Sequence, residues 1–234
     1  MKLQKLTQTN KAVSKRRYDD ACAATHGMNI VGERWALPVM RELMLGSRRF
    51  GELKASLRGI SANVLTQRLE GLEAAGVVRR VKLPPPASVQ VYELTPWGYE
   101  AGPIFQVLGR WAVKSPEHDP SRPFSPVSLM LAFRTMGSAE RAAGLDATIA
   151  FHIGEDRFSL RIVDGRIEPK RGEPDKADLV FAGASTSIAA AAFGGVPIEA
   201  LEADGQLQVE GDRALAARFV TLFPLPAKAP SAAG

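Results

Sequence analysis

The chain has 234 residues, 45% of them hydrophobic and 24% charged, with a formal net charge of +5, an ordinary globular composition with room for one large domain or two small ones. Its single cysteine, Cys22, excludes an internal disulfide framework and favours a reducing compartment. The sequence contains neither a signal peptide nor an apolar run of the ~20 residues that cross a bilayer, so we expect a cytoplasmic protein without integral membrane association.

Charge is distributed unevenly along the chain. Residues 1–115 contain 18 Lys and Arg against 9 Asp and Glu, whereas residues 116–234 contain 12 against 16. A basic half joined to an acidic half predicts two domains with different partners, and the expected partner of the first is a polyanion. Residues 1–19 are expected to form a basic N-terminal arm.

Apolar periodicity predicts three helices in the next segment, over 20–31, 34–45 and 49–57. Pro38 is compatible with the second of these helices only in its first turn, so that helix starts no earlier than Arg34. A fourth helix follows, with Ser61 as its N-cap and Gly76 at its end. Its apolar stripe consists of Leu65, Leu69 and Leu72.

The pattern then changes to a period of two, which predicts a hairpin. Its strands cover 77–83 and 89–94 and flank a stiff, proline-rich turn. Thr95-Pro96 has the pattern of an N-cap followed by proline at the first helical position, and this helix runs to about Lys114 with an irregularity at Pro103. Helices followed by a basic hairpin and one more helix are typical of a winged helix-turn-helix.

The second half combines short strands with helices. Four prolines indicate a linker over 115–126, and residues 127–224 form the second domain. The expected strands cover 145–153, 157–163, 166–168, 178–181 and 206–210. The expected helices cover 127–141, 185–193, 197–203 and a last segment capped by Asp212 and ending near Phe223. Residues 225–234 are expected to be a disordered tail.

These elements predict an α+β fold class. A winged helix-turn-helix DNA-binding domain over 20–114 precedes a small helix-backed β-sheet domain over 127–224. An α-helix with its side chains is about 10–12 Å wide and fits the B-DNA major groove, which is roughly 12 Å wide. The start of such a helix also directs its amide hydrogens toward phosphate.

The polar face of the fourth helix is suited to reading bases. Asn63 and Gln67 can each form paired hydrogen bonds to adenine, and Thr66 offers both a hydroxyl and a methyl group. Basic side chains before this helix and on the hairpin would contact phosphates. The alternatives are a solvated helix face and an ordinary charged strand. The predicted DNA contacts are Arg48, Arg49, Ser61, Asn63, Thr66, Gln67, Arg68, Arg79, Arg80 and Lys82.

Several linked motifs make the first half resemble one family. The motifs are VGERW at 31–35, GSRRFGEL at 46–53, LTQRL at 65–69 and YELT at 92–95. Their order over roughly residues 20–113 resembles the HxlR family of bacterial transcription regulators. The resemblance implies a homodimer that binds two-fold-related operator DNA, with the terminal helices of this domain forming the dimer interface. Pro38 and the Ala62-Asn63 pair depart from the commonest pattern, so base preference is not transferred.

Cys22 falls at a position where some members of this family sense oxidants or electrophiles. The resemblance therefore implies a redox-sensing role for Cys22. Basic residues at 15–17 would lower the pKa of its thiol, whereas Asp19 and Asp20 would oppose them. The alternative interpretation is a small buried hydrophobe.

The second half has a resemblance of its own. Residues 178–183, residues 205–212 and the closing helix resemble the sterol-carrier-protein type lipid-binding fold, over roughly 125–224. The resemblance implies a twisted sheet backed by helices around an apolar cavity that binds lipids without transforming them. The residues predicted to line this cavity are Phe133, Phe151, Phe158, Phe181, Phe193, Phe219 and Phe223. Plain core packing is the alternative for each, because core and cavity have the same composition.

No catalytic or metal-binding pattern is found. The three histidines lack metal-ligand spacing, and the chain has neither a phosphate-binding Gly-Lys-Ser/Thr loop nor a nucleophile elbow. We therefore expect a non-enzymatic protein without a cofactor. The leading hypothesis is a homodimeric transcription regulator that binds double-stranded operator DNA and responds to a lipid or apolar small molecule. The alternative is a lipid carrier whose basic half serves dimerisation or docking to anionic membranes.

Overall fold

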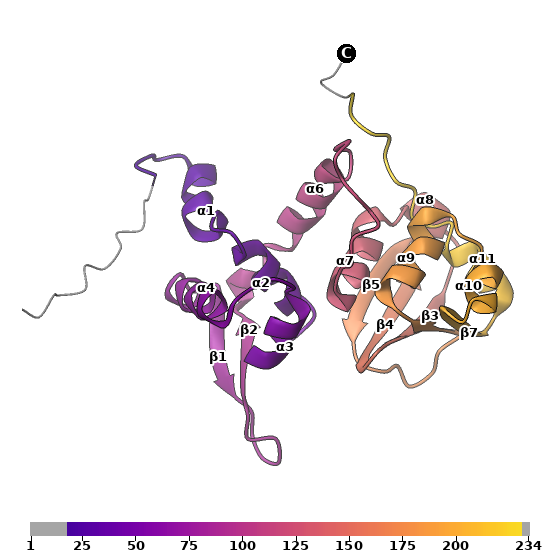
Figure 1. Cartoon of the computed structure of the whole chain (residues 1–234), viewed down its shortest axis with the longest axis horizontal. Coiled ribbons are helices and arrows are strands. Elements are labelled where there is room, and N and C mark those ends of the chain that lie inside the picture. The colour runs from indigo at the N-terminus through magenta and orange to yellow at the C-terminus, as the bar shows by residue number, and fades with distance from the viewer. Residues whose placement is uncertain (1–17, 231–234) are drawn as a thin grey trace, which may run out of the picture.

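The computed structural model describes residues 18–230, so almost all of the predicted basic arm lies outside the described residues. Two bodies lie side by side in Figure 1, one built from α1–α6 with the β1–β2 hairpin and the other from α7–α11 with a larger sheet. We call them the winged-helix domain and the sheet domain. None of the helices within 18–230 has the length and apolarity that crossing a membrane requires.

The winged-helix domain follows the predicted order of elements. Its bounds are α1 Ala23–Val31, α2 Ala36–Leu43, α3 Phe50–Ser56, α4 Ala62–Ala74, β1 Val78–Lys82, β2 Gln90–Leu94, α5 Pro96–Tyr99 and α6 Gly102–Ala112. Helix α4 begins as predicted, because the Ser61 hydroxyl accepts a hydrogen bond from the Val64 amide at 3.2 Å. It ends before Gly76, whose φ of +75° suits a residue without a Cβ.

The long helix predicted from Thr95 is divided in two. Helix α5 is capped by the Thr95 hydroxyl, which accepts from the Gly98 amide, and it ends at Tyr99. Helix α6 then begins at Gly102, with Pro103 in its first turn. Proline lacks an amide hydrogen and its ring clashes with the carbonyl four residues earlier, so a continuous helix is interrupted where the irregularity was predicted.

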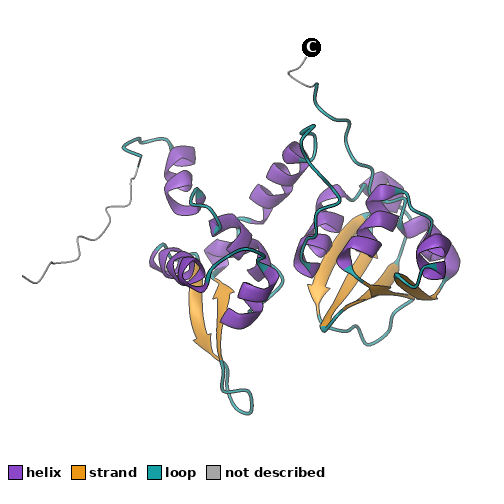
Figure 2. Cartoon of the chain, viewed as in Figure 1, coloured by secondary structure: helices purple, strands orange, loops and turns teal. Residues whose placement is uncertain are grey.

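The sheet domain contains a five-stranded sheet in the order β5-β4-β3-β6-β7. Strand β3 pairs in parallel with β6, and the other pairs are antiparallel. The bounds are α7 Pro126–Met136, α8 Ala139–Ala142, β3 Ala147–Ile153, β4 Asp156–Val163, β5 Arg166–Arg171, β6 Leu179–Gly183, α9 Ser185–Gly194, α10 Ile198–Ala203, β7 Leu207–Gly211 and α11 Arg213–Phe219. Figure 2 shows the helices of this domain lying against the sheet as a second layer.

Three predicted boundaries in this domain were wrong. The helix expected over 127–141 breaks at Gly137, whose backbone turns to an extended conformation, and Ser138 caps the separate helix α8. Strand β5 extends past Glu168 through Pro169, which is tolerated because β5 is an edge strand. The last helix ends at Phe219 rather than near residue 223.

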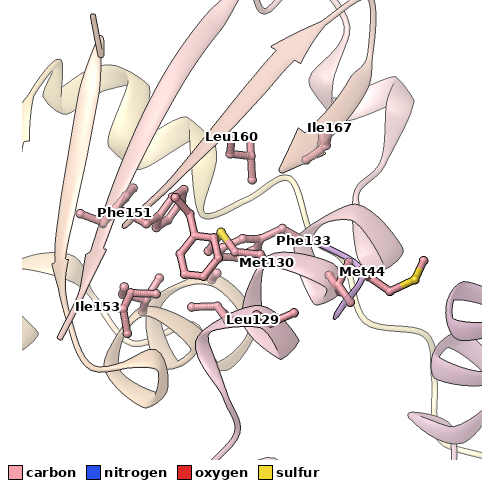
Figure 3. Packing of buried hydrophobic residues seen from close by; sticks show 14 of the residues in the cluster. Met44, Leu129, Met130, Phe133, Phe151, Ile153, Leu160 and Ile167 are labelled. Atoms are coloured by element: carbon pink, nitrogen blue, oxygen red, sulfur yellow. The ribbon is translucent and has the colours of Figure 1, made fainter. Parts of the chain in front are cut away.

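One hydrophobic core runs through both domains. Leu129, Met130 and Phe133 of α7 point toward Phe151 and its neighbours on the sheet, and Met44 of the winged-helix domain lies at the other end of the cluster (Figure 3). The two domains are therefore packed against each other around α7.

Polar contacts accompany this packing. The Ser125 hydroxyl donates to Glu42 Oε1 at 2.6 Å, and Arg110 Nε donates to the Thr135 carbonyl at 2.6 Å. Glu42 is fully buried, and the Arg41 guanidinium neutralises it from 2.8 Å. A buried carboxylate with these two partners ties α2 to the start of α7.

The tail does not match its predicted disorder over the part that is described. Residues 225–230 form neither helix nor strand, but Lys228 Nζ donates to the carbonyls of Val113 at 3.1 Å and Ser115 at 3.0 Å. The Ala229 amide also donates to the Lys114 carbonyl at 2.7 Å. A cation at the carboxyl end of α6 is electrostatically favourable, which explains why this segment is held. Residues 231–234 lie outside the described residues.

Candidate functional site

The polar face of α4 is open to solvent. Ser61, Asn63, Thr66 and Gln67 are all exposed, while the leucines of the opposite stripe are buried. Within 18–230, the side chains of Asn63, Thr66 and Gln67 form no hydrogen bonds with other residues. These groups have their donors and acceptors free, as a helix that reads base edges requires.

The hairpin places three basic side chains beside this face. Arg79 pairs with Glu93 at 2.6 Å, and Arg80 pairs with Glu73 at 3.1 Å, but both guanidinium groups remain well exposed. Lys82 is exposed and forms no ion pair within the described part of the chain. Surface ion pairs of this kind are weak, so a phosphate can displace the carboxylate partner.

The two arginines before α3 have different environments. The Arg49 side chain is exposed, whereas that of Arg48 is only 8% exposed. Arg48 Nη1 lies 3.1 Å from Asp156 Oδ1 in the sheet domain, and its Nη2 donates to the Ser56 hydroxyl at 3.3 Å. The predicted phosphate contact of Arg48 is therefore withdrawn, because this guanidinium is used between the two domains.

Arg68 is also less available than its predicted role requires. Its side chain is 17% exposed, and Nη1 lies 3.1 Å from Glu33 Oε2. The pair joins the middle of α4 to the segment before α2. Arg68 thus orients the helix within its domain, and its phosphate contact would require the Glu33 pair to open.

Helix α6 presents an apolar face to solvent. Four large side chains are exposed on it, by 40% to 72%: Ile104, Val107, Leu108 and Trp111. Met28 of α1 is also 51% exposed. Several large apolar side chains exposed together on one helix are typical of a protein–protein interface.

Cys22 is exposed and immediately precedes α1, which corrects the alternative of a buried hydrophobe. The amide groups of Thr25 and Ala24 at the start of this helix lower the pKa of the Cys22 thiol. The basic residues at 15–17 that were considered in its environment lie outside the described residues.

Most of the phenylalanines predicted to line a ligand cavity are packed in the core instead. Phe133, Phe151, Phe158, Phe181 and Phe219 are 0–1% exposed. Phe133 lies 4.7 Å from Phe223 and 5.3 Å from Phe219 between ring centroids. Four of these rings pack on one another, and Phe158 is buried against the Arg171 guanidinium. The core interpretation therefore holds for these five residues, and the cavity prediction is corrected for them.

A smaller hollow of about 450 Å³ opens at the edge of this cluster. It lies between α9, the end of α11 and the start of the tail, and Phe193 and Phe223 contribute to its lining. Of the seven predicted residues, these two therefore border open space. The rest of the lining is mainly alanine, valine, isoleucine and leucine.

Residues 18–230 contain no group of three or more His, Cys, Asp or Glu side chains that could hold a metal ion. His152 contacts Glu173 at 2.8 Å. His26 and His118 are both exposed.

Sequence reasoning missed a second hollow, of about 480 Å³, between the two domains. Its lining includes Arg41, the Leu57-Arg58 turn before α4, Ser125 and Ser185. The sequence predicted no functional role for Arg58, and Ser185 only began one of the predicted helices. No local pattern could have brought these residues together, because they belong to four separate segments.

Comparison with known proteins assigns both halves. Residues 30–120 match the family described as HxlR-like helix-turn-helix, and residues 130–224 match the SCP-2 sterol transfer family. The HTH-type transcriptional regulator YvaP of Bacillus subtilis is 36% identical over 87 residues, which cover 37% of this chain and 81% of YvaP.

A mycobacterial relative extends further along the chain. The HTH-type transcriptional regulator Mb3122 of Mycobacterium bovis is 34% identical over 152 residues, covering 65% of this chain and 87% of that protein. Among solved structures, the reduced form of the transcriptional regulator YodB from B. subtilis is 31% identical, covers 42% of this chain and 98% of its own, and has a TM-score of 0.38.

Proposed function

The chain belongs to the HxlR-like helix-turn-helix family of transcriptional regulators, and on that premise we propose that it binds operator DNA as a homodimer. The observation that carries the proposal is the exposed, unpaired polar face of α4 beside the basic hairpin. In the proposed complex α4 enters the major groove, and Asn63, Thr66 and Gln67 contact base edges. The start of the helix at Ser61 faces a phosphate.

Phosphate contacts supply most of the binding free energy in this proposal. Arg49, Arg79, Arg80 and Lys82 carry them, and Arg48 is no longer included. Arg68 contributes only if its pair with Glu33 opens. Neutralising phosphates releases counterions, so the affinity for DNA should fall steeply with salt.

The homodimer is supported by the apolar face of α6. Burying Val107, Leu108 and Trp111 against a second copy removes this surface from water. Two copies of α4 would then sit about 34–36 Å apart and enter successive major grooves. The proposed role is non-enzymatic and cytoplasmic, since it requires only access to DNA.

The SCP-2 match supports a regulatory ligand for the sheet domain. The apolar hollow beside Phe193 and Phe223, about 450 Å³ in volume, has the size and lining to hold an apolar small molecule or part of a lipid. Occupancy there would act on the tail, because the residues that follow Phe223 line the hollow and lead to Lys228 at the end of α6.

The competing function is lipid transport, with the basic half serving dimerisation or membrane docking. The replacement Gln67→Ala separates the two functions, with Lys54→Ala as an exposed control on the neighbouring helix. Fluorescence anisotropy with DNA fragments should show that Gln67→Ala reduces the preference among sequences while the control does not. If the DNA affinity does not change with salt, and bound lipid is the only ligand detected, the results would contradict the regulator hypothesis and support the carrier.

A further inference from the structure

The hollow between the two domains combines charge with apolar walls. Its volume is about 480 Å³, within the range of small-molecule sites. Four segments build it: α2, the turn between α3 and α4, the linker before α7 and the start of α9. Arg41 and Arg58 are the charged lining residues, and no carboxylate belongs to the lining.

The two arginines differ in how much of their charge is already compensated. Arg41 is paired with the buried Glu42 at 2.8 Å, so it contributes little net charge to the hollow. Arg58 is exposed and forms no ion pair with any residue in 18–230. The hollow therefore has one uncompensated positive charge, which matches a ligand with a single negative charge.

The hollow is also lined by the beginning of α9, a helix of 10 residues whose N-cap, Ala184, provides no side-chain hydrogen bond. The Ser187 and Ile188 amides both donate to the Ala184 carbonyl, which leaves the amides of Ser185 and Thr186 without a carbonyl partner in the helix. Ser185 is only 7% exposed, yet within the described ranges its hydroxyl has no hydrogen-bond partner, and it lines the hollow together with Thr186. The Ser185 oxygen is not among the fully enclosed polar atoms that lack a partner, so it is open to the hollow and can donate a hydrogen bond to a ligand there.

The remaining walls are apolar. Trp35, Pro38 and Leu57 lie on the winged-helix side, and Phe124 lies on the linker. Flat aromatic and proline surfaces of this kind suit a planar ring better than a flexible chain.

We propose that this hollow binds an aromatic carboxylate, with the ring between Trp35 and Phe124 and the carboxylate held by Arg58, Ser185 and the amides at the start of α9. The proposal deepens the function proposed above, because such a ligand would act on DNA binding. Arg58 lies three residues before Ser61, the N-cap of α4, so a ligand that spans Arg58 and α9 fixes α4 relative to the sheet domain.

The test uses the full-length chain and two probes of the same shape, naphthalene-2-carboxylate and its neutral analogue naphthalene-2-carboxamide. Isothermal titration calorimetry should show that the acid binds about tenfold more tightly than the amide, the range expected for a hydrogen bond to a charged group. Arg58→Gln should remove this difference, whereas the matched control Lys54→Gln on α3 should keep it. Ser185→Ala should weaken binding of the acid severalfold, and Ser187→Ala, one position beyond the lining residues, should not.

A second readout locates the bound probe. The chain has three tryptophans, so the double replacement Trp97→Phe and Trp111→Phe leaves Trp35 as the only indole. Saturation with the carboxylate should then change the Trp35 fluorescence with the same midpoint as the heat signal. Unchanged Trp35 fluorescence in a chain that binds the acid would place the ligand elsewhere and overturn the proposal.

Two further results would overturn the proposal: equal affinity of acid and amide, or an absence of saturation up to about 10 mM, which would mean binding at least tenfold weaker than a millimolar site. DNA affinity is measured on the same variants without probe, which keeps the two proposals separable. Failure of probe binding in a chain that still binds DNA eliminates the aromatic-carboxylate site alone. Probe binding by a chain that does not bind DNA would instead eliminate the proposed regulator.

Discussion

The Ser125 hydroxyl donates a 2.6 Å hydrogen bond to Glu42 Oε1 and also accepts the Ser128 amide that begins α7. One oxygen atom therefore caps the first helix of the sheet domain and donates to one oxygen of a buried carboxylate of the winged-helix domain. Arg41 holds the same carboxylate oxygen at 2.8 Å. This contact therefore ties α2 of the winged-helix domain to the start of α7.

Replacing Ser125 with alanine should therefore destabilise the chain by more than an ordinary capping change. Loss of the cap costs about 1 kcal/mol, and the Glu42 carboxylate, which is fully buried, loses a donor worth a further 1–3 kcal/mol. Urea unfolding measures the change, with Ser138→Ala as the control because Ser138 caps α8 without a carboxylate partner. Equal destabilisation by the two changes would show that the Glu42 contact contributes nothing.

The adjacent arginines Arg48 and Arg49 form a matched pair for a second prediction. Arg48→Gln should lower the free energy of unfolding by about 1–3 kcal/mol, because it breaks a largely buried pair with Asp156. Arg49→Gln should change stability by less than about 0.5 kcal/mol, since Arg49 is exposed.

Their effects on DNA binding should be the reverse. The slope of log affinity against log salt should fall by about 0.9 for Arg49→Gln, the value for one phosphate contact, and stay unchanged for Arg48→Gln. A lower slope for Arg48→Gln in a folded chain would restore Arg48 to the DNA surface.

The apolar face of α6 predicts a dimer that one acidic residue disrupts. Val107 is 69% exposed, and Val107→Glu would place a carboxylate from each copy inside the proposed interface. Burying an unpaired charge should weaken association by about 3 kcal/mol, on the order of 100-fold in the dissociation constant. Sedimentation velocity measures this shift.

The same exchange at Val196, which is 37% exposed and lies in the sheet domain, supplies the control for Val107. Val196→Glu should leave the oligomeric state unchanged. A dimer that survives Val107→Glu at the same concentration would place the interface elsewhere.

Cys22 supplies a prediction about pH. The amides at the start of α1 lower the pKa of its thiol, so the folded chain holds the thiolate at pH values where the unfolded chain, with an ordinary pKa of about 8.5, is still protonated. Alkylation by iodoacetamide should therefore rise at a lower pH in the folded chain than in urea. If the pH midpoint of alkylation in the folded chain is equal to that in urea, or higher, the basis for redox sensing by Cys22 is removed. Redox sensing also requires that alkylation of Cys22 change the DNA affinity.

Local features were predictable because their causes are local. The Ser61 and Thr95 caps, the positive φ at Gly76 and the break near Pro103 each depend on residues within a few positions. The errors in boundaries arose where tertiary context decides, as at Pro169, which is tolerated only because its strand lies at the sheet edge.

The candidate site was less predictable, because its chemistry depends on distant partners. Arg48 and Arg49 are indistinguishable by sequence, and only the approach of Asp156, more than 100 positions later, separates their roles. The filled core around Phe133 has the composition of a ligand cavity, so only packing decides between the two. Composition identifies the class of residues in a core, but not the space left between them.

The most direct test of the central claim is selection of DNA sites by the full-length chain from random duplexes at physiological salt. If the homodimer reads DNA through α4, two inverted half-sites should be enriched, with centres about 10 base pairs apart or a multiple of one helical turn, and Gln67→Ala should lose the half-site preference. If no sequence is enriched, or if Gln67→Ala enriches the same sequences as the unchanged chain, the result would contradict a homodimer that reads DNA through α4.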